Sequence, residues 1–177
     1  MGIKLEIGSG CNPTDGYVHC DAYRNDDCPD VLDIVCDARN VPLDSGSCDD
    51  VLMFGVFEHF GIFEIEDVVA EVFRLLAPGA LFKFDVPDFD WFLEVYRTGN
   101  DINTGQKIRR ENAEDWALKS IFGGQDKPGM FHLWGWNEIR LRRFLSDNRR
   151  WKFSEIKMVG RQWRDPEANH LIWECIK

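Results

Sequence analysis

The chain has 177 residues, 44% of them hydrophobic and 29% charged, which is enough for one globular domain with a sizeable core. No apolar run approaches the roughly 20 residues that span a bilayer, and no signal-peptide pattern opens the chain, so we expect a cytoplasmic protein without a membrane partner. The net charge of −10 divides into −14 for residues 1–100 and +4 for residues 101–177, so the first part suits a cationic ligand and disfavours nucleic acid.

The first predicted strand leads into a turn that is built from two glycines. Apolar and polar residues alternate over residues 3–7, and then Gly8 and Gly10 break the pattern. Without a Cβ, these two residues let the backbone turn sharply and expose its amides to a ligand. A second strand over 17–21 ends in Asp21. A glycine turn beside a strand-end acid is the arrangement with which open α/β sheets hold a nucleoside.

The spacing between the glycines and the acid separates two kinds of nucleoside ligand. In dinucleotide-binding folds a helix lies between them, and the acid follows about 20 residues on. Here only residues 11–20 stand between Gly10 and Asp21, too few for a helix and a strand together. The helix N-terminus that would receive a pyrophosphate is therefore missing. This favours a nucleoside without phosphates and disfavours a nicotinamide-dependent oxidoreductase.

The six cysteines form no CxxC pair, which argues against a zinc site and against a redox motif. Cys20 and Cys36 fall in predicted strands, where a thiol behaves as a small apolar residue. We therefore expect reduced, structural thiols, and we assign no metal ligands in this chain.

The remaining elements follow from apolar periodicity and from turn residues. In the first half they are a strand over 31–36 ending at Asp37, a turn over 42–47, a strand over 51–54, a helix over 65–76 ended by Pro78-Gly79, and a strand over 81–87. In the second half they are helices over 89–96, 109–121 (Trp116, Ala117 and Ile121 inward) and 137–148 (Asn137 as its cap; Ile139, Phe144 and Leu145 inward), and strands over 152–159 and 169–176 around a turn at Asp165-Pro166.

Five segments in order over residues 3–90 resemble the class I S-adenosylmethionine-dependent methyltransferases. They are Leu-Glu-Ile-Gly-Ser-Gly-Cys-Asn-Pro at 5–13, Asp21, Cys-Asp-Ala-Arg-Asn-Val-Pro-Leu at 36–43, Val-Phe-Glu-His-Phe at 56–60 and Leu-Ala-Pro-Gly-Ala-Leu at 76–81. The resemblance is to the compact branch in which the first helix is reduced or lost. It implies an α/β, Rossmann-like sheet, mostly parallel with an antiparallel last strand, in a single domain over 1–177.

The same resemblance implies S-adenosyl-L-methionine as cofactor and indicates the residues that bind it. In that family the strand-end acid, here Asp21, holds the ribose hydroxyls. Asp37 and Ala38 would lie beside the adenine, with the carboxylate accepting from its exocyclic amine, although Asp37 could instead be a turn residue. The full cofactor set is Glu6, Gly8, Ser9, Gly10, Asn12, Asp21, Ala22, Asp37, Ala38, Phe54, Gly55 and Phe57.

Three side chains are candidates for acid–base chemistry. His59 follows the fourth strand and could titrate near neutral pH as a base, or the pair Glu58-His59 could only cap a helix and order the loop. Asp88 follows the fifth strand and faces the expected acceptor pocket, or else caps the helix over 89–96. His132 is the third candidate.

Residues 98–134 interrupt the pattern and are predicted to form an insertion or lid over the acceptor site. Gly-Gly-Gln at 123–125 and His-x-x-Gly at 132–135 resemble segments that roof the acceptor site in compact family members. Glycines would allow movement and aromatic residues would exclude water, although many of the seven tryptophans and thirteen phenylalanines must simply form core.

The predicted function is methyl transfer to an oxygen or nitrogen atom of a small molecule, with a sugar-like acceptor favoured. The basic balance of residues 101–177 would attract an anionic substrate, unless it is only a solvated helix face. The alternative is a catalytically inactive S-adenosylmethionine-binding protein that acts as a partner or scaffold. Because the sulfonium leaving group is already activated, the protein mainly aligns the acceptor, and the sequence does not identify that acceptor.

Overall fold

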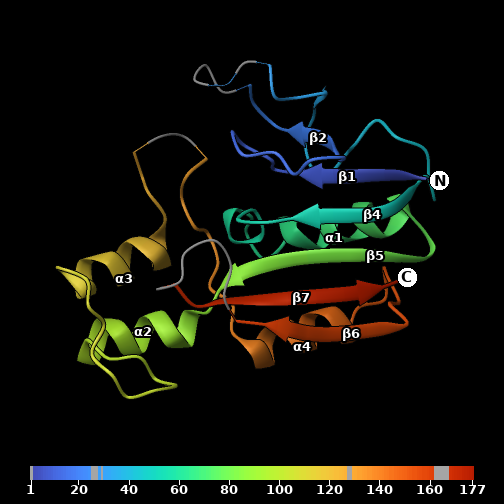
Figure 1. The fold of residues 1–177 in the computed structure, drawn as a ribbon. Helices are drawn as coiled ribbons and strands as arrows, with labels where there is room; N and C mark the ends of the chain where they lie inside the picture. The colour runs from blue at the N-terminus through green and yellow to red at the C-terminus, as the bar shows by residue number, and fades with distance from the viewer. Residues whose placement is uncertain (1, 25–27, 29, 127–128, 162–167) are drawn as a thin grey trace.

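The computed structural model describes residues 2–24, 28, 30–126, 129–161 and 168–177, and its centre is one seven-stranded sheet of order β3-β2-β1-β4-β5-β7-β6 (Figure 1). The strands are β1 (Ile3–Ile7), β2 (Val18–Asp21), β3 (Ile34–Val35), β4 (Cys48–Met53), β5 (Leu76–Pro87), β6 (Glu155–Gly160) and β7 (His170–Ile176). Strands β1 to β5 pair in parallel, whereas β7 runs antiparallel to β5 and to β6. The expected mostly parallel sheet with an antiparallel last strand is confirmed.

The helices are η1, a 3₁₀ turn (Phe57–His59), α1 (Glu64–Leu75), α2 (Phe89–Thr98), α3 (Ala113–Phe122) and α4 (Glu138–Ser146). No helix lies between β1 and β2, whose connecting residues 8–17 are all described. The two strands pair directly, with Leu5 opposite Val18 and Ile7 opposite Cys20. The predicted loss of the first helix is therefore confirmed. None of the helices in the described part of the chain is long and apolar enough to cross a bilayer.

The main core packs α1 against the central strands. The helix presents a continuous buried stripe, made of Ile65, Val68, Val69, Val72 and Leu75. On β5, Phe84 stacks with Phe82 at a centroid distance of 4.7 Å and with Phe57 of η1 at 4.6 Å. Because the Phe57 ring is fully buried in this stack, the short turn η1 is fixed to the core.

A second, smaller apolar cluster holds α2 and α3 together. The ring of Trp116 on α3 lies edge-on to Trp91 and Phe92 of α2, with centroid distances of 5.8 and 5.3 Å. Ala117 is buried in the same cluster, and Ile121 packs against it, as the sequence predicts. In Figure 1 both helices lie beyond the ends to which the arrowheads of β1, β2, β4 and β5 point. They therefore border the edge of the sheet where α/β proteins bind ligands.

Some predicted boundaries and faces are wrong. Helix α1 ends at Leu75 and β5 begins at Leu76, so Pro78-Gly79 lies inside the strand. This is possible because the β4–β5 register shifts between Cys48 and Asp50, and a strand tolerates proline at such an irregularity. Ile139 is 72% exposed rather than inward, and Leu141 takes the buried position in α4.

Strand β3 is much shorter than predicted, α3 starts four residues later and β6 starts at Glu155. The cap of α4 is confirmed, because the Asn137 side chain accepts from the amide of Arg140 at 2.9 Å. The predicted turn at Asp165-Pro166 lies outside the described residues.

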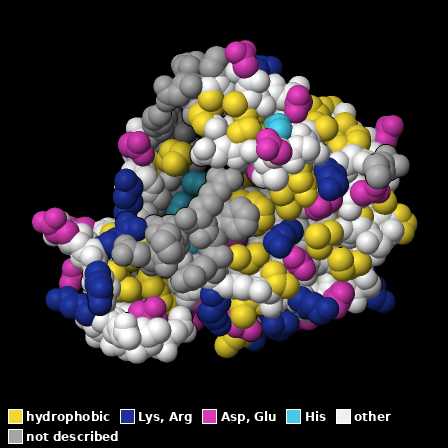
Figure 2. Space-filling model, viewed as in Figure 1, with side chains coloured by type: hydrophobic (Ala, Val, Ile, Leu, Met, Phe, Trp, Pro, Cys, Tyr) yellow, Lys and Arg dark blue, Asp and Glu magenta, His cyan; other side chains and the backbone are white. Residues whose placement is uncertain are grey.

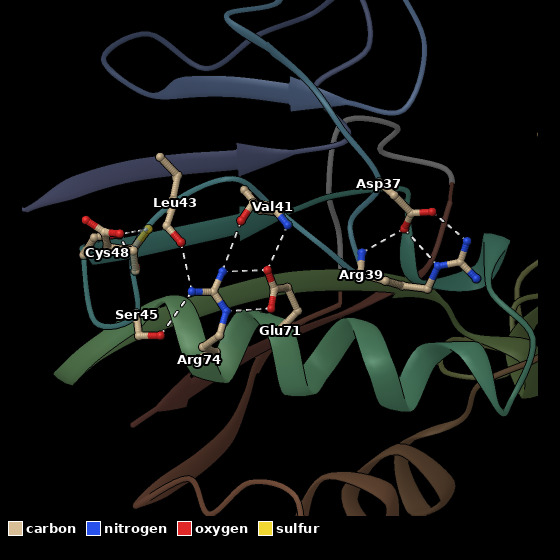
Figure 3. A network of polar contacts seen from close by, with 10 residues as sticks. Asp37, Arg39, Val41, Leu43, Ser45, Cys48, Glu71 and Arg74 are labelled. Carbon is tan, nitrogen blue, oxygen red and sulfur yellow. Dashed lines mark hydrogen bonds and ion pairs between the residues drawn. The ribbon is translucent and has the colours of Figure 1, made fainter.

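The loop between β3 and β4 is tied down by one arginine of α1 (Figure 3). The Arg74 guanidinium donates to the carbonyls of Leu43 and Val41 at 2.9 and 3.1 Å, and to the Ser45 hydroxyl. It also pairs with Glu71, whose carboxylate accepts from the Val41 amide at 2.8 Å. These contacts fix the loop whose first turn contains Asp37 and Ala38.

Replacing Arg74 by methionine should lower the free energy of unfolding by about 1–3 kcal/mol, because the carbonyls of Val41 and Leu43 lose a charged donor. Urea unfolding followed by tryptophan fluorescence measures this change. Lys157→Met is the matched control, since its ion pair with Glu155 lies on the surface and should leave stability unchanged. Equal stability of the Arg74→Met and Lys157→Met proteins would contradict the role given to the clamp.

Candidate functional site

The glycine turn after β1 is built for close approach of another chain segment. Gly8 has φ +75° and Gly10 has φ +54°, both in the left-handed region that favours glycine. A Cβ on Gly8 would lie 2.2 Å from Cγ2 of Val56, in the loop after β4. Gly8 is therefore required where the loops after β1 and β4 meet.

The predicted acid lies directly beside this turn. Asp21 Oδ2 accepts from the amide of Gly10 at 3.3 Å, and Oδ1 accepts from the amide of Ala22 at 2.7 Å. The structure thus brings Gly10, Asp21 and Ala22 together, and the Asp21 side chain remains half-buried.

Two further residues of this segment, Glu6 and Ser9, have buried polar side chains. Both oxygens of Glu6 accept from Thr14, from its amide at 2.7 Å and from its hydroxyl at 2.9 Å, so Glu6 holds the loop after the glycine turn. Asn12 lies in that loop and donates its amide to the Ser9 carbonyl at 3.3 Å. The Ser9 hydroxyl is buried and has no hydrogen-bond partner among the described residues. A buried hydroxyl without a partner is costly and indicates a place where a polar ligand would bind.

Asp37 is engaged by the protein itself. Its carboxylate pairs with the Arg39 guanidinium at 2.6 and 2.9 Å and accepts the Arg39 amide at 2.8 Å (Figure 3). The hydrogen bond from Arg39 holds the pKa of Asp37 below its usual range. Asp37 therefore acts as a turn residue, which is the alternative to adenine binding that its sequence position allows. The neighbouring Ala38 is buried.

The loop after β4 is fixed by an acid that the sequence analysis missed. Asp85 on β5 is fully buried, accepts from the Gly55 amide at 2.7 Å and lies 2.7 Å from Nδ1 of His170 on β7. Its only sequence signal is a charge within an apolar strand. The hydrogen bond from Gly55 to Asp85 orders the backbone at Phe54 and Gly55. The Phe57 ring is buried in the core, so only the backbone of this residue can contribute to the site.

Glu58, His59 and His132 come together across 73 residues of sequence. The rings of His59 and His132 are 4.9 Å apart, and Glu58 Oε1 lies 3.9 Å from His132 Nε2. The segment with His132 is anchored by the Leu133 amide, which donates to the Glu58 carbonyl at 2.8 Å. Figure 2 shows histidine side chains at the bottom of a hollow on this face.

Hydrogen bonds fix the tautomers of both imidazoles. Nδ1 of His59 lies 3.0 Å from the Phe131 carbonyl, and Nδ1 of His132 lies 2.8 Å from the Ser120 carbonyl. Because a carbonyl can only accept, each Nδ1 carries the proton and each Nε2 keeps a lone pair. Burial, and next the charge of His59, lower the pKa of His132 to about 4. Burial, and next the charge of Asp85, raise the pKa of Glu58 above its usual range.

Asp88 has a different position from the two histidines. It occupies the N-cap position of α2, and its Oδ2 accepts from Arg161 at 2.9 Å and from Asn169 at 3.4 Å. The side chain is 6% exposed, and burial raises its pKa despite the arginine. Its carboxylate therefore joins α2 to the two ends of the connection between β6 and β7.

One expectation about the cysteines is wrong. Cys11 and Cys28 form a disulfide, so these two thiols are not reduced, whereas Cys20, Cys36, Cys48 and Cys175 are free. The 17-residue separation carries no spacing signal, and pairing of distant cysteines cannot be deduced from sequence alone. The bond closes the loop that runs from the glycine turn past β2.

A surface groove of about 610 Å³ lies elsewhere. It is lined by ten residues, among them Ile62, Glu66, Arg140, Arg143 and Asn148, and includes none of the candidate cofactor or acid–base residues.

Comparison with known proteins agrees with this geometry. Residues 10–84 match the family model described as "Methyltransferase domain". A search of the curated proteins found no match. Among solved structures, the chain is similar to an S-adenosylmethionine-dependent methyltransferase from Thermotoga maritima, described as a possible histamine N-methyltransferase, at 15% identity and TM-score 0.66, over 100% of this chain and 83% of that one.

Two other structures show the same fold. One is an S-adenosylmethionine-dependent methyltransferase from Methanosarcina mazei, at 17% identity and TM-score 0.57, over 99% of this chain and 90% of that one. The other is the CurJ carbon methyltransferase, at 14% identity and TM-score 0.57, over 99% of this chain and 48% of that one. Since nitrogen and carbon methyltransferases both occur among these descriptions, the fold does not determine the acceptor atom.

The depressed pKa of His132 predicts how stability depends on pH. Between about pH 6.5 and pH 4 the unfolded chain binds a proton at this residue and the folded chain does not, so stability falls as the pH falls. The free energy of unfolding of the wild type should fall by up to about 3 kcal/mol relative to His132→Gln across this range. Urea unfolding at a series of pH values measures the difference, and parallel curves for the two proteins would refute the prediction.

Proposed function

We propose that the chain methylates an oxygen or nitrogen atom of a small molecule, because residues 10–84 match a model of the methyltransferase domain and the whole chain is similar in fold to an S-adenosylmethionine-dependent methyltransferase. The observation that carries the proposal is the contact of Asp21 with the Gly10 amide, beside the buried Ser9 hydroxyl, which has no hydrogen-bond partner among the described residues. Together they form a site for a nucleoside that lacks phosphates. S-adenosylmethionine, when bound, supplies an activated methyl group.

The residues at the glycine turn fit such a cofactor. Asp21 keeps lone pairs for two ribose hydroxyls, and Ser9 offers a hydroxyl that no described residue uses. The turn at Gly8 and Gly10 keeps side chains away from the ligand. We assign binding to the backbone of Phe54, Gly55 and Phe57. We give Asp37 and Ala38 the position beside the adenine, since the Asp37 oxygens that accept from Arg39 still have acceptor capacity for the exocyclic amine.

The second half of the proposed site is a lid over the acceptor, formed by residues 98–134. It contacts η1 through the Leu133 amide, and its own His132 lies against His59. Four of its exposed apolar side chains, which are Phe122, Met130, Phe131 and Leu133, would be covered when an acceptor binds. This would exclude water from the transfer.

The proposed acceptor is a sugar-like hydroxyl compound, and a histidine would take its proton. A hydroxyl must lose a proton to become a nucleophile, and a neutral imidazole with a free Nε2 lone pair can accept it. His59 and His132 both have that tautomer, whereas Asp88 is occupied by Arg161. The histidines are therefore preferred over Asp88 as the general base.

Replacing Asp21 by alanine should weaken binding of S-adenosylhomocysteine by about 10–100-fold, because a charged hydrogen-bond acceptor for the ribose is lost. Isothermal titration calorimetry measures the affinity. Asp30→Ala is the matched control, since it removes an exposed carboxylate from the next loop and should leave the affinity unchanged. Circular dichroism confirms that both variants fold, and an unchanged affinity in Asp21→Ala would disprove the assignment.

Turnover tests the enzymatic part of the proposal. With S-adenosylmethionine and a panel of monosaccharides, sugar acids and small amines, release of S-adenosylhomocysteine should appear for at least one acceptor. His59→Ala and His132→Ala should lower kcat more than KM if either residue removes the proton. Cofactor binding without turnover on the whole panel would instead support a binding protein that acts as a partner or scaffold.

A further inference from the structure

We propose that Glu58, His59 and His132 form a binding site for a divalent transition-metal ion. Each residue offers one ligand atom, and these three atoms lie within 4.8 Å of one another. Two elements supply them: η1, fixed to the core by Phe57, and the segment after α3. The inference rests on the proposed function only for the role of the ion, not for its binding. A bound ion would occupy the Nε2 lone pairs of both histidines, so it would replace their proposed role as general base.

The carboxylate is the first independent observation. Glu58 is 3% exposed, and its Oε2 is buried without a hydrogen-bond partner among the described residues. Its Oε1 lies 3.9 Å from His132 Nε2, which is too long for a hydrogen bond. A buried carboxylate normally has a cation or several donors around it. A metal ion between Glu58 and the imidazoles supplies that partner.

The imidazoles are the second observation. In metal sites a histidine ligand commonly donates its other ring N–H to a backbone carbonyl, which fixes the ring and directs its lone pair at the metal. His59 and His132 both make such a bond, to Phe131 and to Ser120.

A protonated Glu58 that donates to His132 is the simplest metal-free explanation. It would satisfy one carboxyl oxygen and one imidazole, but the 3.9 Å separation does not form that bond, and His59 would have no part in it. A metal ion accounts for all three groups at once. Ligands at about 2.1 Å from one ion lie about 3.0–3.4 Å apart, so binding requires only a small contraction.

Two imidazoles and one carboxylate form the donor set that proteins use for Zn²⁺ and for non-haem Fe²⁺. Three protein ligands leave coordination positions open. These open positions would take an acceptor whose oxygen atom completes the coordination, and this favours a hydroxylated or carboxylated small molecule over an amine.

Metal titration of the chelator-treated full chain tests the site. Isothermal titration calorimetry with Zn²⁺ should give one equivalent per chain, and Co²⁺ should produce visible d–d absorption. Glu58→Gln and His132→Asn should each weaken Zn²⁺ binding by at least 10-fold. His19→Asn is the matched control, because it removes a partly buried histidine outside the cluster and should bind Zn²⁺ as the wild type does.

The absence of stoichiometric Zn²⁺ and Co²⁺ binding would overturn the inference, and so would equal weakening by His19→Asn and His132→Asn. Near-UV circular dichroism shows whether each variant is folded, and His59→Asn provides a second test if one variant is not. S-adenosylhomocysteine binding by the chelated protein is measured in parallel. Failure there would count against the cofactor site, whereas loss of metal binding alone would count against the metal site.

Discussion

The direct pairing of β1 with β2 is the constraint on which the rest of the site depends. Because only residues 8–17 connect the two strands, Ile7 lies opposite Cys20. In the turn that follows Ile7, the Gly10 amide donates a hydrogen bond to Asp21. A helix in this connection would have separated the glycine turn from the acid and placed its N-terminus under a phosphate. The short connection instead leaves a compact site with backbone amides, one carboxylate and the Ser9 hydroxyl.

The sequence predicted those features that depend on neighbours in the chain. The alternation in β1, the apolar stripe of α1 and the Asn137 cap are local, and the structure has them. The predicted element boundaries and buried faces are wrong where contacts with residues distant in the sequence determine them. Leu76 leaves the helix because it pairs with Cys48, and Ile139 points outward because Leu141 fills the space against the core.

The candidate site divides in the same way. The contact of Gly10 with Asp21 spans 11 residues, so spacing alone could indicate it. The contact of Asp85 with His170 spans 85 residues, and His132 lies 73 residues from His59. Single histidines and acids at such distances have no pattern that links them. Only the fold, through the antiparallel return of β7 and the segment after α3, places them side by side.

Glu58 is the residue whose position needs a functional explanation. An unpaired carboxylate in the core costs several kcal/mol, and a glutamine of the same size would avoid most of that cost. Nearby, Asp85 is already satisfied by Gly55 and His170, so the protein can provide partners for an acid at this depth. In the described part of the chain, Glu58 Oε2 has no such partner although two imidazoles lie beside it, and this burial should lower the stability of the fold. Unfavourable burial of this kind is typical of functional sites, because the missing partner is a group that the protein must bind.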